Sequence, residues 1–166
     1  VSPQMVAYLV SVGFDATTAS LAFSAHGFLT VFGIAGTGWL AGQYGSRRIA
    51  TLSYAMTITG VIGLAALMAL PMFTLMVLAI IPLGLSQGSR GPIVSVEASR
   101  VFAGRGLGAI YGGMTMGVGL GGMIGTWLSG VLYDLSGGYL PAYVLSVLCA
   151  LAGVFVFWGI REPARR

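Results

Sequence analysis

Long apolar stretches separated by short polar turns run along the whole chain. Spans are predicted at about 18–41, 49–70, 73–96, 107–133 and 142–160, each close to the roughly 20 residues that a transmembrane helix needs. A shorter apolar run at 5–14 cannot cross about 30 Å of hydrocarbon, and it lacks the flanks of a signal peptide. The pattern predicts an all-α membrane protein, a six-helix bundle of five full spans and one partial span.

Composition excludes a water-soluble domain. The chain is 57% hydrophobic and 7% charged over 166 residues, whereas soluble domains carry about 25% charged residues. So much apolar surface needs a lipid bilayer as its surroundings. Val1 is not an initiator methionine, so we expect the chain to be a fragment whose first span is cut short. Cys149 lies alone in an apolar run, so neither a disulfide nor a metal or cofactor site is predicted.

The arginines predict an orientation. One set of loops contains Arg47, Arg48, Arg100, Arg105, Arg161, Arg165 and Arg166. The opposite loops, around Asp15, Pro71 and Asp134, contain no cation. Short arginine-rich loops stay in the cytoplasm, so we expect a plasma membrane (bacterial inner membrane) protein with a cytoplasmic C-terminus. Because these cations sit at segment ends, they indicate topology, and no nucleic-acid partner is predicted.

The span at 107–133 is unusually rich in glycine. Residues four apart on a helix lie nearly above one another, so glycines at this spacing form ridges without side chains. Such ridges let another helix approach closely in lipid. We therefore expect this span to be the central packing helix of the bundle, through Gly108, Gly112, Gly113, Gly117, Gly121 and Gly125.

Arg90 is the most informative single residue. It lies inside the span 73–96, roughly 8 Å from the predicted midplane toward the cytoplasm at about 1.5 Å per residue. An intramembrane arginine marks a functional site by default, although one at this depth can also extend to the headgroups. The span is expected to be interrupted by its prolines and glycines, as in transporter binding sites. Ser86 and Gln87 are candidate substrate-binding neighbours.

Three other side chains have two interpretations each. His26, the single histidine, suits proton coupling or substrate binding, and equally a packing role. Thr115 lines the cavity or packs in the core. Glu97 pairs locally with Arg100, or across the inner face with Arg47 or Arg48 as a breakable gate.

Two segments resemble a known family. Residues 38–48, GWLAGQYGSRR, resemble the G-x-L-a-D-r-x-G-r-r loop of the major facilitator superfamily. Residues 130–139, GVLYDLSGGY, look like the end of the eleventh helix in its monocarboxylate and oxalate/formate branch. The resemblance implies helices seven to twelve, with the first truncated, and a missing N-terminal six-helix half as partner. It also implies gating by the loop residues Gly38, Gly45, Arg47 and Arg48.

The chain departs from the family pattern in two places. Gly42 and Gln43 replace the aspartate and arginine of the loop, which weakens the salt bridge that latches it. The spans 18–41 and 107–133 contain no Lys or Arg, although oxalate-type relatives place cations in the eighth and eleventh helices. This departure disfavours a dicarboxylate held in the same way.

The residues favour transport over catalysis. No Ser-His-Asp arrangement, metal cluster or phosphate loop is present, so an enzyme is not predicted. A guanidinium at position 90 matches a carboxylate, which favours secondary transport of a small organic anion such as a monocarboxylate, by proton symport or anion exchange. A non-transporting sensor or assembly module, and an efflux carrier for uncharged solutes or drugs, are the alternatives.

Overall fold

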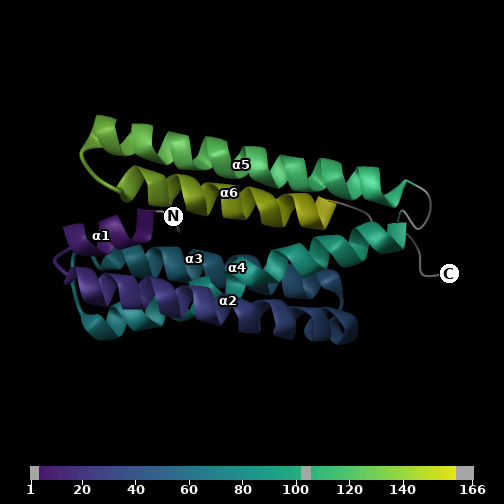
Figure 1. The fold of residues 1–166 in the computed structure, drawn as a ribbon, viewed down its shortest axis with the longest axis horizontal. Coiled ribbons are helices and arrows are strands. Elements are labelled where there is room, and N and C mark those ends of the chain that lie inside the picture. Colours follow the sequence, from purple (N-terminus) through teal and green to yellow (C-terminus); the bar gives the residue numbers. More distant parts are fainter. Residues whose placement is uncertain (1–3, 102–105, 160–166) are drawn as a thin grey trace.

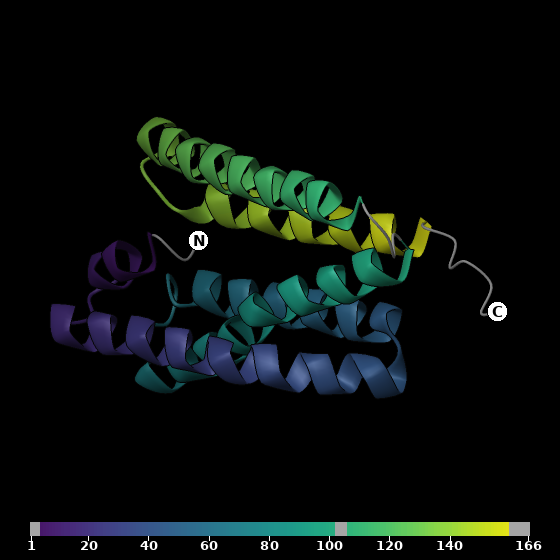
Figure 2. The same ribbon diagram turned by 45° about the vertical axis from the view of Figure 1, so that its right-hand side comes forward.

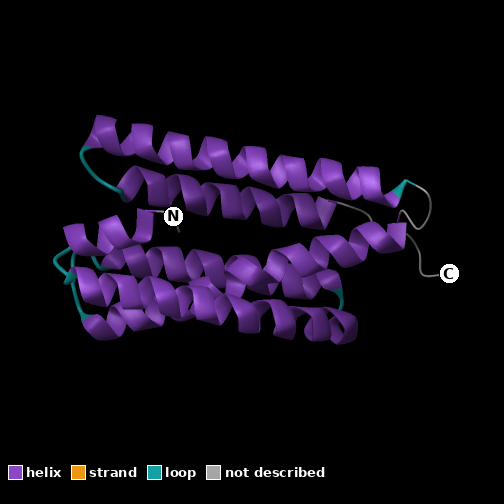
Figure 3. Cartoon of the chain, viewed as in Figure 1, coloured by secondary structure: helices purple, strands orange, loops and turns teal. Residues whose placement is uncertain are grey.

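Six helices and short loops make up the structure, a computed structural model that describes residues 4–101 and 106–159 (Figure 3). The helices are α1 (Met5–Ser11), α2 (Ala16–Tyr44), α3 (Ser46–Ala66), α4 (Phe73–Val101), α5 (Leu107–Ser136) and α6 (Leu140–Gly159). Within those ranges there is no strand. The predicted all-α class and the number of helices are confirmed.

The helices form two layers (Figures 1 and 2). Helices α2, α3 and α4 pack together in one layer, with extensive contacts between α2 and α4 and between α3 and α4. Helices α5 and α6 form an antiparallel hairpin over this layer, joined to it mainly through α3 and α6. The short α1 lies at the end of the bundle where α2 begins and packs against α2.

Four of the helices are long and apolar enough to cross a membrane, namely α2, α3, α4 and α5. Within the part of α6 that the search covered, Leu140–Val156 forms a shorter apolar helix. Helix α1 has seven residues, about 10 Å at the usual rise, which is far less than the hydrocarbon thickness. These lengths are consistent with a membrane-embedded bundle.

The connection between α2 and α3 is shorter than expected. The predicted spans 18–41 and 49–70 leave residues 42–48 between them, but α2 continues to Tyr44 and α3 begins at Ser46, so Gly45 alone links them. Gly45 has φ of 84°, a conformation that glycine adopts without steric cost. Its N–H donates to the carbonyl of Ala41 at 3.2 Å. Arg47 and Arg48 therefore belong to the first turn of α3.

Helix α4 is continuous, and the expected interruption of this span is wrong. Pro82 and Pro92 both lie inside the helix. Each proline removes one backbone hydrogen bond, but leaving the helix in lipid would expose many more unpaired backbone groups. Continuation of the helix is therefore the less costly arrangement.

Glycine mediates the close helix contacts at α4. A Cβ at Gly33 of α2 would lie 2.2 Å from the carbonyl oxygen of Leu85, and a Cβ at Gly88 would lie 2.3 Å from that of Thr30. Gly60 of α3 similarly faces α4, with the carbonyl oxygen of Ala79 at 2.9 Å from a Cβ built there. Only residues without side chains allow α2 and α3 to approach α4 this closely.

The prediction that 107–133 is the central packing helix is wrong for this chain. Helix α5 lies at the edge of the bundle, where it contacts α6 and one part of α4 (Figure 2). Among the described residues, no atom from outside the glycine's own stretch of helix lies within 4 Å of the Cβ position at the six glycines predicted to pack, Gly108, Gly112, Gly113, Gly117, Gly121 and Gly125. The four-residue spacing showed that these glycines form ridges, but it did not show which helix, if any, packs against those ridges.

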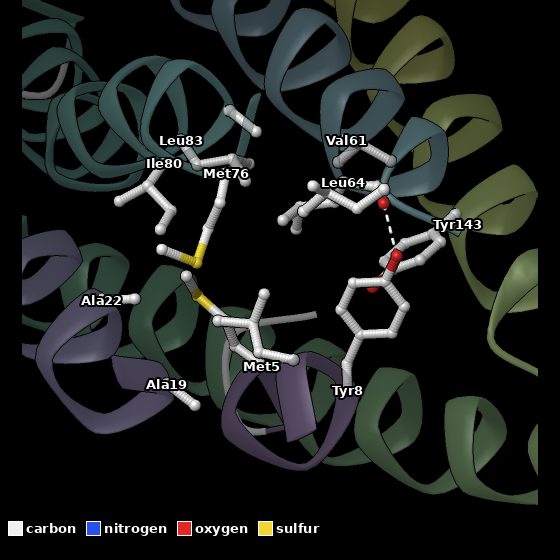
Figure 4. Packing of buried hydrophobic residues seen from close by; sticks show 13 residues of the cluster. Met5, Tyr8, Ala19, Ala22, Val61, Leu64, Met76, Ile80, Leu83 and Tyr143 are labelled. Carbon is white, nitrogen blue, oxygen red and sulfur yellow. Dashed lines mark hydrogen bonds between the residues drawn. The ribbon is translucent and has the colours of Figure 1, made fainter. Parts of the chain in front are cut away.

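The main apolar core joins α1 to α2, α3, α4 and α6 (Figure 4). Tyr8 is fully buried, and its hydroxyl donates to the carbonyl of Leu64. Its ring makes edge contacts with Tyr139 and Tyr143, at centroid distances of 5.2 and 5.1 Å. A second cluster near the α2–α3 link contains Ala41, Ile49, Ala50 and Ile93. The two clusters leave the middle of α3 and α4 free to line a cavity.

Candidate functional site

A cavity of about 590 Å³ lies between the two layers. This volume falls within the range of small-molecule sites, about 300–1,000 Å³. Helices α3 to α6 all contribute to its wall, through Tyr54, Thr57, Val61, Leu83, Gln87, Arg90, Gly121, Gly122, Gly125, Thr126, Ser129, Ala142, Leu145, Ser146, Cys149 and Ala150. Arg90 is the single charged side chain in this set. The wall is otherwise made of small apolar groups, hydroxyls, an amide, a phenol and a thiol.

Arg90 is held by uncharged groups. One terminal nitrogen of its guanidinium donates to the Thr57 hydroxyl at 2.6 Å, and the guanidinium carbon lies 4.7 Å from the centre of the Tyr54 ring. Its Nε is buried without a hydrogen-bond partner. No carboxylate of a described residue forms an ion pair with Arg90. Among the described residues, the guanidinium therefore presents a positive charge that no neighbouring side chain neutralises.

A chain of buried hydroxyls between α3 and α4 supports Thr57. Its hydroxyl lies 2.9 Å from the hydroxyl of Ser86, which itself donates to the carbonyl of Leu83 at 3.0 Å. The hydroxyls of Ser53 and Ser89 are hydrogen-bonded one helical turn away. Because Thr57 has one hydrogen and two lone pairs, it donates into this network while it accepts from Arg90. The network fixes the oxygen that orients the guanidinium.

The wall opposite Arg90 is formed by α5 and α6 and carries acceptors. The hydroxyl of Thr126 donates to the carbonyl of Gly122 at 2.8 Å, and that of Ser146 donates to Ala142 at 2.9 Å. Each hydroxyl therefore uses its hydrogen inside its own helix and retains lone pairs. The cavity thus combines one cationic wall with a weakly polar wall that has no acidic side chain.

Two of the predicted substrate-binding residues, Arg90 and Gln87, line the cavity. Ser86 is fully buried behind the wall and acts on the site through Thr57. His26 is buried on α2, where its ring stacks on Phe23 with centroids 6.2 Å apart, and it does not line the cavity. Thr115 is exposed, donates to the carbonyl of Tyr111 at 2.7 Å, and also lies outside the cavity wall.

Sequence reasoning missed the contribution of α3. Tyr54 and Thr57 are three residues apart, so they share a helix face, but nothing in the sequence shows that this face meets Arg90. Gly121 and Gly125, expected to pack, line the cavity instead. Cys149 also lines it. The sequence did place Tyr54 and Thr57 at about the predicted depth of Arg90. This signal identifies them as neighbours of Arg90 only once the pairing of α3 with α4 is known.

Three of the predicted gating residues, Gly45, Arg47 and Arg48, lie at the α2–α3 link, and Gly38 lies two helical turns before it on α2. Gly38 is exposed on α2, and Gly45 forms the link. Arg47 is partly buried, its carbonyl accepts from the Thr51 hydroxyl at 3.0 Å, and Arg48 is exposed. The structure does not describe the side chain of Glu97. The gate in which Glu97 pairs with an arginine therefore stays a prediction.

Comparison with known proteins identifies the family. The model of the Major Facilitator Superfamily matches residues 1–166. Monocarboxylate transporter 13 of Rattus norvegicus is 28% identical over 155 residues, which cover 90% of this chain and 35% of that protein. The chain thus spans about a third of the length of this relative. No solved structure gives a significant match. The chain is an integral membrane protein of a transporter family, and it belongs to the major facilitator superfamily.

Proposed function

We propose that this chain provides the anion site of a secondary transporter for small organic anions, in particular monocarboxylates. The observation that carries the proposal is the guanidinium of Arg90, which lines a cavity of about 590 Å³ without a carboxylate partner among the described residues. A buried charge without a counter-charge is costly. A bound carboxylate supplies that counter-charge.

The cavity suits a small carboxylate. The guanidinium offers a planar set of donors that fits both carboxylate oxygens, and Gln87 provides an amide on the same helix one turn away. Val61, Leu83 and Leu145 give apolar contacts for a short carbon skeleton. The similar rat protein is named a monocarboxylate transporter, which supports the same class of cargo for this chain.

Binding of an anion also suggests how transport is driven. Arginine stays protonated in proteins, so the empty site retains its positive charge, whereas the loaded site is neutral. A bundle that moves around a neutral site avoids carrying an unpaired charge between conformations. Proton symport and anion exchange both use this difference. Faster release of labelled anion when unlabelled anion is added outside identifies exchange, and its absence with pH-driven uptake identifies symport.

The family suggests the place of this chain in the complete transporter. We propose that residues 1–166 form the C-terminal bundle, with helices seven to twelve, and that an N-terminal six-helix half covers the open side of the cavity. The proposed orientation puts the C-terminus in the cytoplasm of a plasma or bacterial inner membrane, as the arginines indicate. Alternating access then comes from rocking of one bundle against the other.

Substitution of Arg90 in the full-length transporter tests the function. Arg90→Gln removes the charge, and we expect the KM for a labelled monocarboxylate to rise roughly 10- to 100-fold, the value of a hydrogen bond to a charged group. Arg90→Lys keeps the charge and loses the planar fit, so its effect is smaller. Thr115→Val, outside the cavity, is the control. Unchanged uptake in Arg90→Gln would assign Arg90 to the headgroups and favour uncharged solutes.

A further inference from the structure

We propose that Gly153 of α6 sets the charge selectivity of the cavity. The absence of a side chain at this position leaves room for the Tyr54 ring, and that ring holds Arg90 at the cavity wall. Gly153 itself lies outside the cavity wall and acts as a positioning residue through Tyr54. Its consequence for transport rests on the proposed function, whereas its effect on the electrostatic character of the cavity does not.

Gly153 meets the phenol end of Tyr54. A Cβ at this position would lie 2.7 Å from Cζ, 2.8 Å from Cε1 and 2.8 Å from the hydroxyl oxygen of Tyr54. These distances are far shorter than carbon atoms tolerate, so any residue with a side chain at 153 displaces the ring. The other glycine of α6, Gly159, has no atom of a described residue within 4 Å of its Cβ position outside its own stretch of helix.

Tyr54 in turn fixes Arg90. The guanidinium carbon lies 4.7 Å from the ring centre, within the range of a cation–π interaction. Tyr54 and Arg90 also line a smaller hollow of about 20 Å³ with Ala50, Ile93 and Val94. The two side chains therefore separate the main cavity from this hollow. A displaced ring removes one of the two contacts that keep the guanidinium at the cavity wall.

The contact at Gly153 affects the ring more than the helices. The atoms that a Cβ would meet belong to the far end of a side chain with rotatable bonds, so a small rotation of Tyr54 relieves the clash. That rotation shifts the ring relative to the guanidinium and weakens their contact. Gly153→Ala is therefore expected to alter the orientation of Arg90 while α3 and α6 stay packed.

Cys149 provides a reporter that does not depend on the transported substrate. It lines the same cavity as Arg90 and is the single cysteine of these 166 residues. Full-length protein in membranes is treated with an anionic or a cationic methanethiosulfonate reagent of similar size. Mass spectrometry of the peptide that contains Cys149 gives both rates. The ratio of these rates reports the positive charge that the cavity presents, and thermal stability is measured for each variant.

We expect the wild-type protein to react faster with the anionic reagent and Arg90→Gln to lose this preference. Gly153→Ala should lower the anionic-to-cationic ratio at least about 3-fold, which corresponds to about 0.65 kcal/mol, while Gly159→Ala retains it. Tyr54→Leu should lower the ratio similarly, and Tyr54→Phe should retain it because the ring remains. Adding Gly153→Ala to Tyr54→Leu should cause no further change, because the ring that transmits the effect is gone.

Two outcomes overturn the positioning role. One is a wild-type ratio in Gly153→Ala when Arg90→Gln has lost its preference. The other is a wild-type ratio in Tyr54→Leu, which decides the matter even if Gly153→Ala does not fold. Either outcome leaves the proposed function intact. If the ratios change as expected but no monocarboxylate is taken up, the proposed function fails and the positioning role stands.

Discussion

Arg90 takes its position from uncharged side chains, which is unusual for a cation inside a membrane. Thr57 supplies an acceptor at 2.6 Å, and Tyr54 supplies the face of its ring. Neither group neutralises the charge, so the guanidinium is oriented while its capacity to bind an anion is retained. This arrangement differs from a structural ion pair and supports the proposed anion site.

Substitution of Thr57 tests the orientation of Arg90 directly. Thr57→Val keeps the shape and removes the acceptor, so the guanidinium loses its fixed hydrogen bond. We expect KM for a monocarboxylate to rise roughly 10-fold, since hydrogen bonds to charged groups contribute about 1.5–3 kcal/mol, with little change in kcat. Thr57→Ser retains the hydroxyl and should behave like wild type. Uptake kinetics of the full-length transporter measure both variants, and equal KM values would contradict this role.

Asp15 predicts a pH dependence at the start of α2. Its carboxylate accepts the N–H of Thr17 at 2.9 Å, and this hydrogen bond lowers the pKa of Asp15 below its usual 3.8. The stabilising contribution of a lowered pKa is present above the unfolded value and is lost as the pH falls through the folded value. Thermal unfolding in detergent should show Asp15→Ala less stable than wild type at neutral pH. A difference that persists at pH values below both pKa values would contradict this assignment.

The sequence identified part of the site for a clear physical reason. An arginine inside an apolar span is conspicuous, and Gln87 lies one helical turn before it on the same face. Tyr54 and Thr57 were missed because their role depends on how α3 pairs with α4, which hydropathy does not encode. His26 and Thr115 are polar residues in apolar helices, but His26 belongs to α2, which contributes no residue to the wall, and Thr115 lies two helical turns before Gly122, beyond the part of α5 that lines the cavity.

At the scale of helices, what a glycine faces matters more than how glycines are spaced. Gly33 and Gly88 lie at the crossing of α2 and α4, where a Cβ would meet a backbone oxygen. A Cβ at the regularly spaced glycines of α5 would meet no other described part of the chain within 4 Å. Spacing predicts a smooth helix face in both cases. Only the packing of the helices shows that Gly33 and Gly88, and not the glycines of α5, make the close helix contact within this chain.

Gly33→Ala tests the crossing of α2 and α4. Its Cβ would lie 2.2 Å from the carbonyl oxygen of Leu85, a backbone atom that moves only with its helix. We expect a loss of about 1–3 kcal/mol in stability, as for other overpacked interiors. Gly36→Ala, one turn away with open space around it, should be neutral or gain up to about 1 kcal/mol. Thermal melting of both variants in detergent provides the measurement, and similar melting temperatures would contradict the close crossing.

At the scale of the whole molecule, hydropathy determined the class and the number of helices. Membrane-crossing length forces long apolar runs, which are visible in any sequence. The continuity of α4 through Pro82 and Pro92 was not visible, because proline signals a break in water more strongly than in lipid. Nor does hydropathy show which helices pack centrally, since lipid-facing and helix-facing surfaces are both apolar. The edge position of α5 therefore could not be predicted from hydropathy.

The exposed face of α5 gives the last prediction, which concerns assembly of the complete transporter. The chain spans 35% of the length of its rat relative, and the proposed N-terminal bundle of a protein of that length would have room to cover this face. Because helices in lipid associate through close van der Waals packing, Gly117→Leu should prevent that approach and lower both the melting temperature and the uptake of the full-length protein. Val118→Leu, on the adjacent and highly exposed position, is the matched control. If Gly117→Leu melts and transports like this control, the glycine face of α5 is covered by lipid and does not receive a second bundle.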